Sequence, residues 1–306
     1  LNTGAKPTLQ PGQLPSTTPI QPLPAPVQQA IQLLLQQLPA GETLTRTVDS
    51  PDSGIANVRQ WLAGSGVFAE SSLLQSGTLP PTDLKLALTQ VVARLLAAEG
   101  KGVDTFNRLT PTTSADLLQA PLQFPRFSTP AVTSQGTEPV TVGQMLRLLA
   151  GMLNRITVNQ LHAQSLNTRA GAEPGAPVNT LLMELPFLNP QQEPRVTQLR
   201  LEQYERESAP TDQPGRASVS EWRLSLTMDL DDAGALHFDV NLRLPAVSAQ
   251  VWAEKQDTLR RVNESLPRLR DSLAELGLDI EELACRRGTP QRTETRLEHR
   301  LVDTRA

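Results

Sequence analysis

The sequence contains little cysteine, few aromatic residues and no excess of positive charge. Its single cysteine, Cys285, excludes an intramolecular disulfide framework, and a free thiol fits a reducing compartment. The chain has 28 basic against 32 acidic residues, whereas binding to nucleic acid requires a basic surface. No apolar run approaches the ~20 residues that a membrane-spanning helix needs. We therefore expect no nucleic-acid partner and no membrane insertion.

Patterns of catalytic or metal-binding residues are also missing. The three histidines, His162, His237 and His299, fall in separate regions, and none is near Cys285 in the sequence. The acidic run 229–232 lacks the spacing of a calcium loop and fits a turn better. The sequence therefore predicts a protein that is not an enzyme and that takes no cofactor or metal.

Proline, in contrast, is abundant, with 26 residues in the chain. Proline fixes φ and removes an amide donor, so its density in 1–26 predicts a disordered or polyproline-II leader. This leader is either a passive linker or an element for secretion or docking. It lacks the basic-then-apolar pattern of a secretory signal, so we expect any export to proceed without a cleaved signal.

Apolar residues recur at helical spacing through 27–170, which predicts a helical region with long loops. The helices either pack into a small domain or stand as separate helices on a flexible rod. A Gly- and Pro-rich linker at 171–177 then separates this region from one with alternating residues. The helical stripes are Val27, Ile31, Leu34, Leu35 and Leu38; Ile55, Val58, Trp61 and Leu62; Leu84, Leu88, Val91, Val92, Leu95 and Leu96; and Val142, Met145, Leu146, Leu149, Met152, Leu153 and Ile156.

The C-terminal third predicts an α+β domain over 178–287, an antiparallel sheet packed by one long helix. Alternating residues on both sides of an acidic-Gly turn near Gly234 predict a β-hairpin, and 247–253 a further strand. A leucine stripe over 254–276 predicts a helix that packs on the sheet, kinked or split at Pro267 and capped by Gly277. A last strand holds Cys285 as a small buried residue, and a charged tail follows over 288–306.

Three short segments of this third occur in an order that carries a family resemblance. They are Trp252-Ala253-Glu254, then Leu266-Pro267-Arg268-Leu269-Arg270, and last Gly277-Leu278. Together with the hairpin, they resemble the C-terminal domain of the flagellar hook-length control protein family over about 220–287. The chain is either a member of this family or a divergent paralogue.

The resemblance implies a cytoplasmic protein that is exported through the flagellar type III apparatus. Its C-terminal domain would bind the cytoplasmic domain of the export gate's switch protein and change the export specificity from hook to filament subunits. Hook or hook-cap subunits are further candidate partners. The residues expected to bind are Trp252, Glu254, Pro267, Arg268, Leu269, Arg270 and Gly277.

The region 27–170 separates two functional hypotheses. Family members usually have a long, polar and poorly ordered N-terminal half that reports hook length, whereas this chain has apolar helical stripes there. An unfolded region would favour a molecular ruler. A stably folded region would favour a non-catalytic adaptor or structural protein that reuses the C-terminal domain, with the helical half as a separate binding module.

Overall fold

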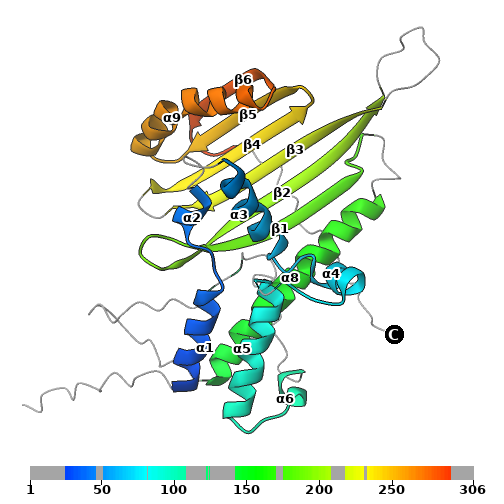
Figure 1. Ribbon diagram of the computed structural model, residues 1–306, viewed down its shortest axis with the longest axis vertical. Coiled ribbons are helices and arrows are strands. Elements are labelled where there is room, and N and C mark those ends of the chain that lie inside the picture. Colours follow the sequence, from blue (N-terminus) through cyan, green and yellow to red (C-terminus); the bar gives the residue numbers. More distant parts are fainter. Residues whose placement is uncertain are drawn as a thin grey trace, which may run out of the picture.

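The computed structural model describes residues 25–45, 51–80, 82–107, 122, 124, 142–169, 175–207, 218–230 and 233–290. In this part of the chain, a group of helices adjoins a six-stranded sheet (Figure 1). The helices are α1 (Ala25–Gln36), α2 (Gly41–Thr45), α3 (Pro51–Ala63), α4 (Ala69–Ser76), α5 (Leu84–Ala98), α6 (Val103–Asn107), α8 (Val142–Arg169) and α9 (Gln256–Glu275). The strands are β1 (Asn179–Leu188), β2 (Pro194–Glu207), β3 (Ser218–Asp229), β4 (Ala235–Arg243), β5 (Ala246–Ala253) and β6 (Asp279–Arg287).

The predicted helices α1, α5 and α8 pack together around one apolar core. Each helix contributes most of the stripe that its sequence predicts, and Leu88 and Leu149 are fully buried at 0% exposure. The helices of the described part are therefore not separate elements on a flexible rod. The predicted leader lies outside the described residues, except for Ala25 and Pro26, which begin α1. The buried core residues include Ile31, Leu34, Leu88, Val91, Leu95, Met145, Leu149 and Ile156.

Helix α3 departs from the expected packing. Its stripe was expected to cover a partner surface along its length, yet Ile55 and Val58 are 52% and 37% exposed. Trp61, in the last turn, reaches β1: its indole N–H donates to the carbonyl oxygen of Pro186 at 2.8 Å, and its ring meets Phe187 edge-on. The first part of α3 therefore projects away from the surface that its end contacts.

The sheet confirms the α+β class and the predicted hairpin. Its strand order is β1-β2-β3-β4-β5-β6, and β3 pairs with β4 around a turn in which Gly234 has a φ of +74°. The first five strands are antiparallel. Strand β6 instead runs parallel to β5, because α9 carries the chain back along the sheet before β6 begins. The expectation of an antiparallel sheet is therefore wrong for the last pair of strands, β5 and β6.

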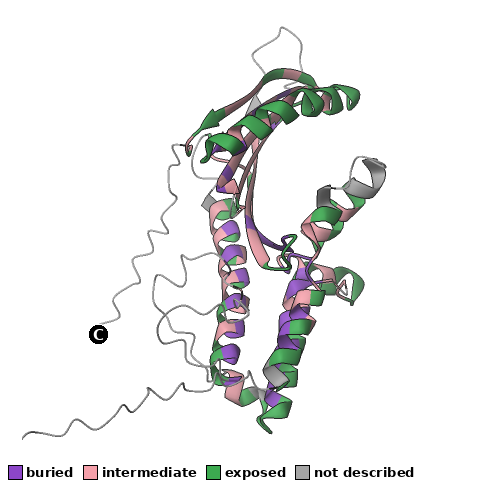
Figure 2. Ribbon diagram, turned by 90° about the vertical axis from the view of Figure 1, so that its left-hand side faces the viewer, coloured by how far each residue is buried: buried purple, intermediate pink, exposed green. Residues whose placement is uncertain are grey.

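The two faces of the sheet differ in character. Residues in register across the strands form a continuous apolar row, for example Leu199, Leu226, Phe238 and Val251. Helix α9 packs on this apolar face over β5 and β6, at one edge of the sheet. Helix α8 packs against β1 at the other edge, on the opposite face, where Glu184 points. Figure 2 shows buried residues along the packed helices, whereas α9 is largely exposed.

Proline does not split α9. The helix runs without a break from Gln256 to Glu275 with Pro267 inside it. The carbonyl group of Asn263 loses its helical donor at this point. Both Asn263 and Pro267 are exposed, so water can satisfy that carbonyl group. The expectation that Pro267 splits the helix was therefore wrong, whereas the alternative of a kink at Pro267 stays a prediction.

Candidate protein-binding surfaces

The leucine stripe of α9 is only partly covered by the sheet. Leu259 and Val262, in the first half of the helix, pack against the buried residues Val251 and Ala253. In the second half, Leu269 is 41% exposed, and Leu276, just beyond the helix, is 70% exposed. The expectation that the whole stripe packs on the sheet was wrong. Helix α9 lies over the last two strands, and since β6 is the edge strand, no further strand covers the outer side of the helix.

A third exposed leucine lies at the same end of the domain. Leu244, in the turn between β4 and β5, is 71% exposed. Its neighbour Pro245 accepts a hydrogen bond at 2.9 Å from the amide of Asp279, which follows α9 closely in the chain. The β4–β5 turn and the end of α9 are thus held together. We call Leu244, Leu269 and Leu276 the leucine patch.

Two arginines flank the middle leucine of this patch. Arg268 and Arg270 are exposed, and within the described part of the chain neither forms an ion pair. By contrast, Arg260, nearer the start of α9, pairs with Asp257 at 3.1 Å. The guanidinium groups of Arg268 and Arg270 can therefore pair with carboxylates of a partner.

The other predicted binding residues lie elsewhere. Trp252 is half-buried on the face of the sheet opposite α9, beside His237. Glu254 accepts a hydrogen bond at 3.0 Å from the amide of Ala235, and so fixes the end of β5 to the hairpin turn. Gly277 has a φ of +78° and ends α9 in a left-handed conformation. The seven predicted residues therefore do not form one site. Pro267, Arg268, Leu269 and Arg270 are contiguous and exposed, and their role in binding stays a prediction.

No feature of the described residues indicates catalysis. They contain no group of three or more His, Cys, Asp or Glu side chains that could hold a metal ion. Cys285 is half-buried in β6, and burial raises the pKa of its thiol, which lowers the fraction of reactive thiolate. Among the same residues, no helix is long and apolar enough to cross a membrane.

A buried ion pair joins the helices to the sheet. The carboxylate of Glu184 in β1 accepts hydrogen bonds from the guanidinium of Arg155 in α8, the shortest at 2.8 Å. It also accepts one at 3.1 Å from the amide of Leu122. The side chains of Glu184 and Arg155 are only 4% and 15% exposed. Neither residue could be singled out from the sequence, because they lie 29 positions apart and only the fold brings them together.

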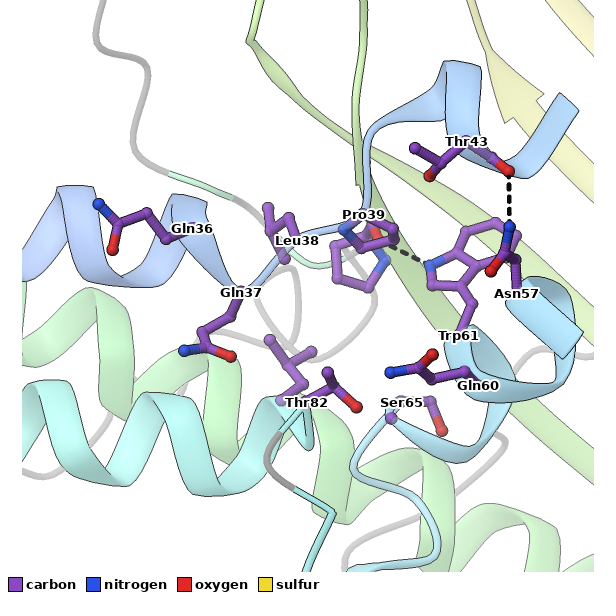
Figure 3. A pocket seen from close by; sticks show the side chains of 13 residues that line it. Gln36, Gln37, Leu38, Pro39, Thr43, Asn57, Gln60, Trp61, Ser65 and Thr82 are labelled. Atoms are coloured by element: carbon purple, nitrogen blue, oxygen red, sulfur yellow. Dashed lines mark hydrogen bonds between the residues drawn. The ribbon is translucent and has the colours of Figure 1, made fainter. Parts of the chain in front are cut away.

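A pocket of about 390 Å³ lies where α1, α3, α5 and β1 meet (Figure 3). Its apolar lining includes Leu38, Pro39 and Trp61, and its polar lining includes Gln37 and Gln60. None of the residues that line it is charged. The pocket thus suits an uncharged ligand. The pocket could not be predicted from the sequence, since its lining comes from four separate segments of the chain.

The described molecule is an α+β protein whose open surfaces are suited to protein contacts. Residues 215–294 match the family model of the flagellar hook-length control protein FliK. The match spans β3 to β6, includes α9 and the leucine patch, and confirms the family resemblance of this domain. The matched family is that of a non-catalytic hook-length control domain. The helices α1 to α8 and the strands β1 and β2 lie outside the match. Comparisons with curated proteins and with solved structures gave no match.

Proposed function

We propose that the C-terminal domain binds the cytoplasmic domain of the flagellar export gate's switch protein through the leucine patch, Arg268 and Arg270. Binding would help to change export from hook to filament subunits, and the chain itself would leave the cell through the same apparatus. The observation that carries this proposal is the exposure of three leucines within the family-matched segment. Their positions on a rigid sheet-and-helix support make them available without rearrangement.

The expected energy of this contact is large enough to measure. Full burial of a leucine side chain contributes about 1.5–3 kcal/mol, and Leu244 and Leu276 are both at least 70% exposed before binding. Hydrogen bonds from Arg268 or Arg270 to partner carboxylates would add specificity, and would weaken as salt concentration rises. Loss of two leucines should therefore weaken binding by well over tenfold.

The test is calorimetric titration of the purified gate domain with the full chain. We expect the double variant Leu269→Asp, Leu276→Asp to lose most of its affinity, because it places carboxylates in an apolar contact. The matched control is Leu74→Asp on α4, where the native leucine is 88% exposed and lies outside the family match. This control should bind like the wild type. Equal binding by the double variant and the wild type would rule out the leucine patch as the contact.

A second candidate function is that of an adaptor that does not measure length. It is favoured by the folded core of α1, α5 and α8, which continues onto the sheet through Leu188 and Val196. Helix α8 rises only about 1.5 Å per residue, against ~3.3 Å for extended chain, so the folded helices are poorly suited to span a growing hook.

An insertion into the chain between α6 and α8 would distinguish a molecular ruler from an adaptor. Forty extra polar residues would lengthen an extended ruler by about 130 Å at ~3.3 Å per residue. If the helical region acts as a folded adaptor, hook length should not change. Hooks that lengthen in proportion to the insertion would instead establish the ruler.

A further inference from the structure

We propose that the pocket between α1, α3, α5 and β1 is a docking site for the proline-rich leader of the same chain. The site lies outside the family match and is independent of the contact with the export gate. Its occupant would be the part of the leader between Pro11 and Pro24.

The chemistry of the lining points to a peptide. The side chains of Gln37, in the turn that follows α1, and Gln60, in α3, line the pocket (Figure 3). Within the described part of the chain, neither side-chain amide makes a hydrogen bond. An amide group both donates and accepts, as peptide backbone does, so these two groups are suited to hold an extended chain.

The apolar lining is suited to proline rings. Trp61 is half-buried, and its indole N–H is already used by Pro186, so its ring offers a flat apolar surface. Pro39 lies beside it and lines the pocket as well. Aromatic-lined grooves of this kind bind polyproline-II segments, whose unpaired carbonyl groups accept hydrogen bonds from the groove.

The leader fits this pocket in charge and in length. From Pro11 to Pro24 it has no charged residue, in agreement with the uncharged lining. It enters the described part of the chain at the start of α1, and the pocket lies at the end of the same helix. Helix α1 is about 18 Å long at 1.5 Å per residue, whereas a polyproline-II segment spans ~3.1 Å per residue. At about 3.1 Å per residue, fewer than ten leader residues are enough to span the length of α1 and reach the pocket at its end.

The test uses the full chain with its three tryptophans labelled as 5-fluorotryptophan. Cys285→Ser removes the native thiol, and Ser16→Cys carries a nitroxide in the leader. We expect the nitroxide to broaden the fluorine signal of Trp61 and to leave those of Trp222 and Trp252 sharp. Reduction of the nitroxide should restore the Trp61 signal. The matched control carries the nitroxide at Thr304→Cys and should leave the Trp61 signal sharp.

A pocket variant completes the experiment. Gln37→Glu with Gln60→Glu places two carboxylates in the uncharged lining and should restore a sharp Trp61 signal while the leader label is present. Equal Trp61 signals with the label at position 16 and at position 304 would overturn the proposal. It would also be overturned if labelled chains broadened Trp61 in unlabelled fluorinated chains mixed with them, because the occupant would then be the leader of a second copy.

Discussion

The ion pair between Arg155 and Glu184 predicts how firmly the helices are joined to the sheet. Arg155→Ala removes the partner of a carboxylate that is only 4% exposed and leaves one remaining hydrogen bond, from the amide of Leu122. A buried charge without its partner costs several kcal/mol, because the protein cannot solvate it as water does. The loss of the arginine's own packing adds to this cost.

The expected loss of stability is about 3–5 kcal/mol, the usual cost of breaking a buried pair. The free energy of unfolding of native proteins is about 5–15 kcal/mol, so the variant should lose a large share of its free energy of unfolding. The matched control is Arg260→Ala. Its pair with Asp257 has side chains that are 66% and 81% exposed, and exposed pairs contribute at most about 1 kcal/mol.

Urea unfolding followed by two signals measures this effect. Circular dichroism at the helical band reports mainly on the helices, and the fluorescence of Trp61, Trp222 and Trp252 reports on the sheet and on the end of α3 that contacts it. We expect the two transitions to coincide in the wild type and in Arg260→Ala, and to shift to lower urea in Arg155→Ala. A loss below about 1 kcal/mol in Arg155→Ala would show that the pair does not fasten α8 to β1.

Further predictions concern single positions. Burial raises the pKa of Asp83, so the folded state binds this proton more tightly than the unfolded chain, and the stability that it contributes falls as pH rises through the raised pKa. Asp83→Asn keeps an acceptor for the amide of Leu86 and should remove this fall, which urea unfolding between about pH 4 and pH 7 can detect. Gly277→Ala should cost about 1–2 kcal/mol, because its φ is +78°, whereas Gly151→Ala, inside α8 with open space around it, should stabilise by about 0.5–1 kcal/mol; thermal unfolding compares the two. The thiol of Cys285 should react slowly with iodoacetamide at neutral pH and rapidly in urea, and fast reaction of the native protein would contradict the raised pKa.

Much of the fold could be predicted from local sequence patterns. The β3–β4 hairpin could be predicted because alternation specifies which residues share a face, and the acidic-Gly turn specifies where the chain reverses. The stripes of α1, α5 and α8 likewise predicted which residues enter the helical core. In each case the deciding interaction lies within a few residues along the chain.

Features that depend on distant segments could not be predicted in this way. The spacing of Leu269 and Leu276 shows which side of α9 is apolar, but the sheet beneath decides how much of that side is covered. The burial of Glu184 depends on Arg155, which only the packing of α8 on β1 brings near. The resemblance suggested a region for the candidate site, and the exposure of Leu244 and Leu276 became visible only in the folded chain.

The most direct test of the proposed function is hook length, measured by electron microscopy in a strain that lacks this gene. The strain is complemented either with the wild-type chain or with the double variant Leu269→Asp, Leu276→Asp. We predict hooks of normal length with filaments for the wild type, and overlong hooks without filaments for the deletion strain and for the variant. Normal hooks and filaments in the deletion strain would contradict the proposed role in hook-length control.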